Sequence, residues 1–209
     1  LDCVEWAPVD AWGRIDPDRL PQLDSSTILI LQAGEVNTGE FDRFDELIAR
    51  AAEAGSWVHV DGAFGLWARA SKHRDLTKGV DQADSWTVDG HKWLNTPYDS
   101  AMVIVRDADG VTETMQSDAA YSMSASGAQK NLTLEFSRRA RGIPIWATLR
   151  ALGRDGVAEL IERTVEYAQS VADGLRAAGY EVLNRVVLNQ VLVTTDNPAE
   201  TERIIREAQ

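Results

Sequence analysis

Two side chains in this sequence have the type and the setting for chemistry at a carbonyl group. They are Lys92, in the stretch DGHKWLNTPYD (89–99), and Asp61, in the stretch WVHVDGAFG (57–65). Lysine is scarce here, with four lysines among 21 basic residues. An amine can lose its proton and attack a carbonyl carbon, which a guanidinium cannot do. Taken alone, the eleven residues around Lys92 fit a surface turn with an unimportant lysine as well as they fit a reactive lysine.

The elements that must position these residues follow from the hydrophobic pattern. Short apolar runs bounded by turn residues predict strands over four segments: 26–34, 57–61, 84–89 and 100–106. A helix is predicted over 41–55, capped by Asp42 or a neighbour and stopped by Gly55. A strand, a helix and a strand with short joints make a parallel pair with a right-handed crossover. The expected fold class is therefore α/β, with a mostly parallel sheet and flanking helices.

The second half of the chain has a different pattern. Residues 107–136 are rich in Ser and Ala and predict one long loop. The later segments predict helices over 141–153, 154–179 and 197–209 and strands over 180–184 and 186–195. We expect residues 1–150 to form part of a large domain, and residues 151–209 a linker helix and the start of a small α+β domain. The abrupt ends suggest a segment of a longer protein.

The composition limits the possible partners and compartments. A net charge of −12 argues against a broad nucleic-acid footprint and against anionic membrane surfaces. The single cysteine, Cys3, excludes an internal disulfide and fits a reducing compartment. The first twenty residues carry five acids, so no signal peptide is expected, and no apolar run could span a membrane. These features predict a cytoplasmic protein.

Ligands of open parallel sheets bind at the carboxyl ends of the strands. Asp61 ends one predicted strand, Lys92 follows another, and the loop AGEVNTG (33–39) follows a third. Each feature alone has a simpler explanation, because Asp61 could cap a turn, His91 could cap a helix or turn, and the loop could be only a turn. Trp86 and Trp93 are expected in the core.

Together, HVDGAFGLWA and DGHKWLNTPYD resemble the group II pyridoxal-phosphate-dependent amino acid decarboxylases. The lysine follows the aspartate by 31 residues, as in that family, and LQAGEVNTGEFD and SRRARGIPIWATLRALGRDGVAELIER match it in the same order. The resemblance covers essentially the whole chain. It implies fold type I, pyridoxal 5'-phosphate as the cofactor, an L-amino acid substrate with an aromatic or acidic side chain, and a homodimer.

The resemblance also implies roles for individual residues. Lys92 would form the Schiff base with the cofactor aldehyde, and Asp61 would pair with the pyridine nitrogen and keep it protonated. Ala63 would pack against the ring, His91 would lie near the phosphate, and Asn37 and Thr38 would lie near the ring hydroxyl. No residue is assigned to a metal. The family's phosphate-binding segment lies upstream of any residue in this sequence.

Two positions depart from the family pattern. Glu35 is an acid where Asn or Thr is common, and it would repel the cofactor's anionic oxygen. Leu132 stands where a loop tyrosine usually protonates the product, and Tyr121 is not an obvious replacement. Two alternatives therefore stay open beside decarboxylation. One is another pyridoxal-phosphate reaction, such as aldehyde formation, a lyase or a transferase reaction, and the other is a non-catalytic remnant or partner subunit.

Overall fold

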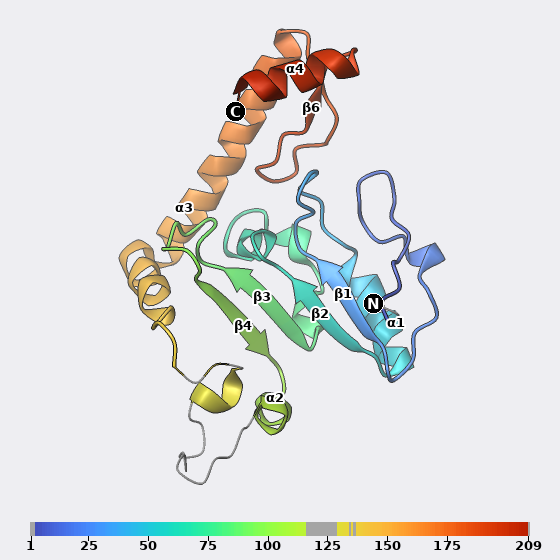
Figure 1. Ribbon diagram of the computed structural model, residues 1–209, viewed down its shortest axis with the longest axis vertical. Helices are drawn as coiled ribbons and strands as arrows, with labels where there is room; N and C mark the ends of the chain where they lie inside the picture. Colours follow the sequence, from blue (N-terminus) through green and yellow to red (C-terminus); the bar gives the residue numbers. More distant parts are fainter. Residues whose placement is uncertain (1–2, 116–128, 134, 136, 209) are drawn as a thin grey trace.

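The computed structural model describes residues 3–115, 129–133, 135 and 137–208. Its main sheet has four strands in the order β1–β2–β3–β4, with β1 to β3 parallel and β4 antiparallel to β3 (Figure 1). The strands are β1 (Ile28–Gln32), β2 (Trp57–Asp61), β3 (Ser85–Asp89) and β4 (Ala101–Val105). Each strand lies inside its predicted segment, so the mostly parallel sheet is confirmed. The lysine segment is the connection between β3 and the returning β4.

Helix α1 (Phe44–Ala54) connects β1 to β2 as predicted. Its buried side chains, Phe44, Leu47, Ile48 and Ala51, recur every three to four residues and so share one face of the helix. That face packs against the buried alternate residues of β1 and β2 in a single core cluster. The core thus fixes the strand register that brings Gln32 opposite Asp61.

Asp42 does not cap α1, so this part of the prediction is wrong. The residue before the helix is Arg43, and no side chain makes a capping hydrogen bond there. The Asp42 carboxylate instead accepts hydrogen bonds of 2.7 Å from the backbone N–H groups of Ile15 and Gln32. Burial raises the pKa of Asp42, although these two bonds act in the opposite direction. The carboxylate therefore ties the N-terminal segment to β1.

The single loop predicted over 107–136 is also wrong in part. Residues Ala108–Met115 form helix α2, which starts where the Asp107 carboxylate accepts from the N–H groups of Asp109 and Gly110. A short 3-10 helix, η5 (Gln129–Leu132), follows later. The other 3-10 helices are η1 (Pro17–Arg19), η2 (Gly65–Ala70), η3 (Arg74–Thr77) and η4 (Val80–Gln82).

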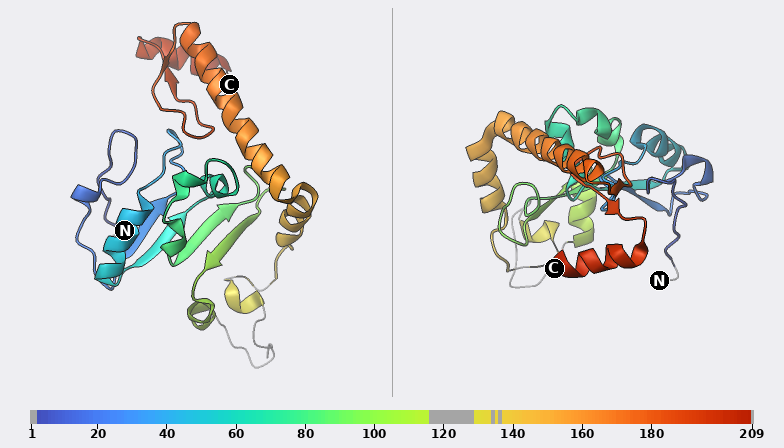
Figure 2. Two further views of the ribbon diagram at one scale, coloured as in Figure 1. Left: turned by 180° about the vertical axis from the view of Figure 1, so that it is seen from behind. Right: turned by 90° about the horizontal axis from the view of Figure 1, so that it is seen from above.

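Helix α3 (Gly142–Ala177) contains the two helices predicted over 141–179. They meet at Gly153, whose φ of 64° and ψ of −173° are non-helical and accessible essentially only to glycine. Beyond Gly153, α3 rises past the sheet and carries the C-terminal elements above the carboxyl ends of β1 to β3 (Figures 1 and 2). These elements are β5 (Glu181–Val182), β6 (Val193–Thr194) and α4 (Pro198–Ala208). The domain boundary expected after residue 150 falls inside α3 and stays a prediction.

The strand predicted over 186–195 is wrong except at β6. Val186 has a φ of 51°, which interrupts an extended conformation. The Asn184 side chain also bonds to backbone groups that would pair with a neighbouring strand in a sheet. Its Oδ1 accepts from Leu192 N, and its Nδ2 donates to Gln190 O. Residues 183–192 therefore form a folded loop, called here the roof segment.

The two faces of the main sheet differ in burial. The face opposite α1 carries large apolar side chains that are exposed within the described part of the chain: Ile28 is 64% exposed, Ile30 58% and Val103 61%. Parallel sheets usually have both faces covered. Among the described helices, none is long and apolar enough to cross a membrane.

Candidate active site

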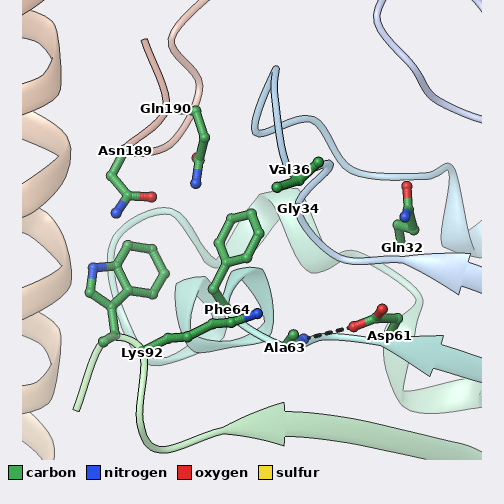
Figure 3. A pocket seen from close by; sticks show the side chains of 10 residues that line it. Gln32, Gly34, Val36, Asp61, Ala63, Phe64, Lys92, Asn189 and Gln190 are labelled. Atoms are coloured by element: carbon green, nitrogen blue, oxygen red, sulfur yellow. Dashed lines mark hydrogen bonds between the residues drawn. The ribbon is translucent and has the colours of Figure 1, made fainter. Parts of the chain in front are cut away.

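A pocket of about 400 Å³ lies at the carboxyl ends of β1, β2 and β3, beneath the roof segment (Figure 3). Its volume and its mixture of apolar and polar groups are typical of small-molecule sites. The lining residues are Gln32, Gly34, Val36, Asp61, Ala63, Phe64, Lys92, Trp93, Asn189 and Gln190. The structure therefore brings Lys92, Asp61 and Ala63 together, as the sequence predicted.

The segment that carries Lys92 is held by hydrogen bonds on both sides. The N–H groups of Gly90 and His91 both donate to Ser100 O, at 2.9 Å and 3.1 Å. The Trp93 indole, buried as predicted, donates to Thr164 Oγ1 of α3 at 2.9 Å. The lysine therefore projects from a fixed turn that is attached to the sheet and to the long helix.

The Lys92 amine points into the pocket and has two neighbours. Its Nζ lies 3.1 Å from Asp89 Oδ2 and 5.7 Å from the centroid of the Phe64 ring. The Asp89 backbone is fixed as well, because Asp89 N donates to Ala63 O and Asp89 O accepts from the Trp67 indole. An anchored carboxylate thus holds the amine at the edge of the pocket.

His91 is not among the residues that line the pocket. Its Nδ1 donates to Ser100 O at 2.8 Å, its Nε2 lies 3.5 Å from Asp89 Oδ2, and its ring centroid lies 4.2 Å from that of Tyr98. These contacts support the lysine segment. The predicted role of His91 near a phosphate is untested by this arrangement and stays a prediction.

Asp61 ends β2 with its carboxylate exposed to the pocket. Its Oδ1 accepts from Ala63 N at 3.1 Å, and no other hydrogen bond to this carboxylate forms within the described residues, so the rest of it is open to a ligand (Figure 3). His59 lies on the same face of the strand, and its Nδ1 is 2.8 Å from Ser85 Oγ. Burial lowers the pKa of His59, and the nearby Asp61 charge only partly offsets this. A neutral imidazole beside Asp61 leaves the carboxylate free to pair with a ligand cation.

Asn37 and Thr38 lie in the β1–α1 loop but do not line the pocket; Val36 does. Both are bound by Glu35, whose carboxylate accepts from Asn37 N at 2.9 Å and Thr38 N at 2.7 Å. Burial opposes ionisation of Glu35, but these hydrogen bonds outweigh it and lower the pKa. Glu35 thus closes the loop on its own backbone and is not among the residues that line the pocket, and the repulsion expected from it stays a prediction. The ligand-binding roles of Asn37 and Thr38 stay predictions.

Sequence reasoning missed several residues that the structure places at the pocket. Phe64 was part of the quoted aspartate stretch, and its ring fits only because Gly34 has no side chain: a Cβ there would lie 2.7 Å from the ring. Asn189 and Gln190 were assigned to a strand. The available signal was two adjacent amides within the apolar run VVLNQVLV.

The residues present fit one end of pyridoxal phosphate. An open carboxylate and a primary amine line one pocket, and the small side chain of Ala63 between them leaves space for a flat ring (Figure 3). Among the described residues no arginine lines the pocket, so the residues present suit the ring and the aldehyde rather than the phosphate.

Comparisons with known proteins agree with this chemistry. The family described as "Pyridoxal-dependent decarboxylase conserved domain" matches residues 26–194. The aromatic-L-amino-acid decarboxylase of Bacillus atrophaeus is 29% identical over 171 residues, which are 78% of this chain and 36% of that protein. The 3,4-dihydroxyphenylacetaldehyde synthase of Aedes aegypti is 27% identical over 157 residues, which are 72% of this chain and 30% of that protein.

A solved structure shows the same fold. The crystal structure of mouse CSAD in apo form superposes with a TM-score of 0.85 at 20% identity, over 99% of this chain and 48% of that one. The fold and the family match together define the class, and the chain belongs to the pyridoxal-dependent decarboxylase family. Its cofactor class is therefore pyridoxal phosphate. The chain spans about a third of the length of the two relatives.

Proposed function

We propose that this protein decarboxylates an L-amino acid with an aromatic or acidic side chain, using pyridoxal 5'-phosphate bound through Lys92. The observation that carries the proposal is the placement of the Lys92 amine and the open Asp61 carboxylate in one pocket at the sheet edge. The family match supports the same chemistry. Because the chain spans only part of its relatives, the activity of the whole protein is itself a proposal.

Each pocket residue has a distinct task in this proposal. Lys92 would hold the cofactor through its amine. Asp61 would keep a proton on the pyridine nitrogen, and Ala63 would support the ring face. When bound, the cofactor supplies an electron sink for the electron pair left on the α-carbon as CO2 departs. A proton must then reach that carbon.

A second reaction, formation of an aldehyde, is favoured by Leu132. This residue ends η5 with 38% of its surface exposed, and it has no proton to give. Tyr121, the other candidate donor, lies outside the described residues. A leucine at this position would not protonate the product carbon, which favours side reactions with oxygen.

The deciding measurement is the amount of amine, aldehyde and CO2 formed per amino acid consumed by the cofactor-loaded protein, with oxygen uptake recorded. We expect slow amine formation with some aldehyde, and a higher amine yield from Leu132→Tyr because a proton donor is restored. Fast and stoichiometric amine release, unchanged in Leu132→Tyr but lost in Tyr121→Phe, would show that the donor was placed wrongly. If no amino acid yields any of the three products, the non-catalytic alternative is supported.

We also propose that the protein acts as a homodimer. Family resemblance implies this assembly, and the exposed apolar side chains of the sheet leave surface that contact with further protein would cover. Light scattering at micromolar concentration should give twice the mass of the chain. A monomer under the same conditions would argue against this assembly.

A further inference from the structure

Three polar side chains on the main sheet form a hydrogen-bonded chain next to Asp61. Burial alternates along β2, so Trp57, His59 and Asp61 share the face opposite α1. His59 stands opposite Ser85 of β3 in the strand register. The Trp57 indole nitrogen lies 2.9 Å from Ser85 Oγ, and His59 Nδ1 lies 2.8 Å from the same oxygen. Neither His59 nor Ser85 lines the pocket, and the proposed function gives neither a task.

The donors in this chain determine the tautomer of His59. An indole nitrogen can only donate, so Ser85 Oγ accepts from Trp57. Ser85 is buried, and within the described residues His59 Nδ1 is the only hydrogen-bond acceptor for its hydroxyl hydrogen. Nδ1 therefore accepts, and the ring hydrogen of the neutral imidazole is on Nε2.

The bond from Ser85 stabilises the uncharged ring. An imidazolium has hydrogens on both nitrogens, so its Nδ1 would have to donate and the buried Ser85 hydroxyl would lose its acceptor. Burial of His59 acts in the same direction and lowers its pKa, whereas the nearby Asp61 charge raises it. Among the described residues, Asp61 is the one charged group that acts on His59; Ile30 and Ser85, opposite it in the neighbouring strands, carry no charge.

The charge of this ring matters because Asp61 is needed elsewhere. Asp61 reaches the pocket at the end of β2, and the proposed function pairs it with a protonated pyridine nitrogen (Figure 3). A charged His59, two residues away on the same face, would attract the same carboxylate and repel the protonated nitrogen. An uncharged His59 does neither.

We propose that Ser85 and His59 are positioning residues that keep a competing cation away from Asp61, and that protonation of His59 sets a lower pH limit for catalysis. This inference rests on the proposed function and adds regulation by acid to it. The sign follows from the lowered pKa of His59: the ring is uncharged at neutral pH and gains its charge only as the pH falls below the ordinary value of 6.5.

The first test observes the imidazole itself by NMR and needs neither cofactor nor turnover. The chain has three histidines, so protein with isotope-labelled histidine gives few ring signals, and those missing from His59→Gln belong to His59. We expect the Nε2–H tautomer at neutral pH and titration below pH 6.5. In Ser85→Ala the titration should move up by about half a unit to one unit, the effect of one hydrogen bond. A charged ring at neutral pH, a hydrogen on Nδ1, or an unmoved titration in Ser85→Ala would overturn the inference.

The second test measures kcat of the cofactor-loaded protein, and the absorbance of the bound cofactor, against pH. In the wild type, kcat should fall as the pH drops through the His59 titration. Ser85→Ala should move this fall to higher pH by the same amount, and His59→Gln should remove it, because an amide gains no charge. Structural damage would instead lower kcat at every pH. Ser170→Ala, at an exposed position in α3, is the matched control and should leave the profile unchanged.

The outcomes of the two tests separate this inference from the proposed function. Normal turnover with a pH profile that is the same in the wild type, Ser85→Ala and His59→Gln would overturn the pH limit while leaving decarboxylation intact. If no amino acid is turned over, the proposed function fails and the pH limit with it, and the NMR titration alone then decides whether Ser85 keeps His59 uncharged.

Discussion

Asp61→Asn is expected to slow turnover of the cofactor-loaded protein on the order of a thousandfold or more. An amide cannot hold a proton on the pyridine nitrogen as a carboxylate does, so the electron sink weakens where the transition state needs it. The cofactor should still attach, because Lys92 and its turn do not depend on the Asp61 charge. The effect should therefore fall on kcat, with cofactor content measured by absorbance nearly unchanged.

The matched control for this change is Asp75→Asn, at an exposed position in η3. It removes the same charge far from the pocket lining and should leave kcat within a factor of about two, as surface substitutions usually do. Near-normal turnover in Asp61→Asn would mean that Asp61 only closes a turn through its bond to Ala63 N. If Asp61→Asn lost bound cofactor but kept the same kcat per bound cofactor, the role of Asp61 would be cofactor binding alone.

Lys92→Arg should abolish covalent attachment of the cofactor. Borohydride treatment of the loaded wild-type protein should leave a pyridoxyl group on the peptide that contains Lys92, and the variant should carry none. A guanidinium stays protonated and cannot add to an aldehyde, although it keeps the charge beside Asp89. Peptide mass spectrometry detects the pyridoxyl group directly, so this test does not depend on catalytic activity.

The control variants for attachment are Lys72→Arg and Lys78→Arg. Both lysines are on the surface and paired with acids, Lys72 with Glu166 and Lys78 with Asp45. Both variants should keep full labelling. Label that appears on either of these lysines or on Lys130, or that persists in Lys92→Arg, would remove Lys92 from its proposed role.

Local pattern was sufficient to predict the strands and α1. In β1 and β2, alternate residues such as Leu31 and Val60 are fully buried, and alternation is visible in a sequence. The pairing of Lys92 with Asp61 was predictable for another reason, because strands of a parallel sheet end at one edge whatever their distance along the chain. Helix α2 was missed because its apolar positions are weak and none of its residues is buried.

The roof over the pocket could not be predicted from local pattern. Residues 186–195 have the composition of a strand, but contacts over a long sequence separation decide their conformation. Asn184 bonds to Thr38 and Arg185 to Glu40, and no local signal marks either pair. The helix cap predicted at Asp42 was wrong for the same reason, because the carboxylate bonds instead to Ile15, which lies well upstream in the sequence. The role of a side chain could not be predicted from its sequence neighbours where its hydrogen-bond partner lies far away along the chain.

The exposed apolar face of the sheet has a colloidal consequence. Ile28 and Ile30 stand on it more than half exposed, on a chain whose net charge is −12. Repulsion between like-charged molecules opposes contact between such faces at neutral pH. As acid titrates the carboxylates towards the isoelectric point near pH 4.7, that repulsion vanishes while the attraction between the faces remains. For any part of this face that the proposed dimer leaves uncovered, charge rather than surface polarity would limit further association.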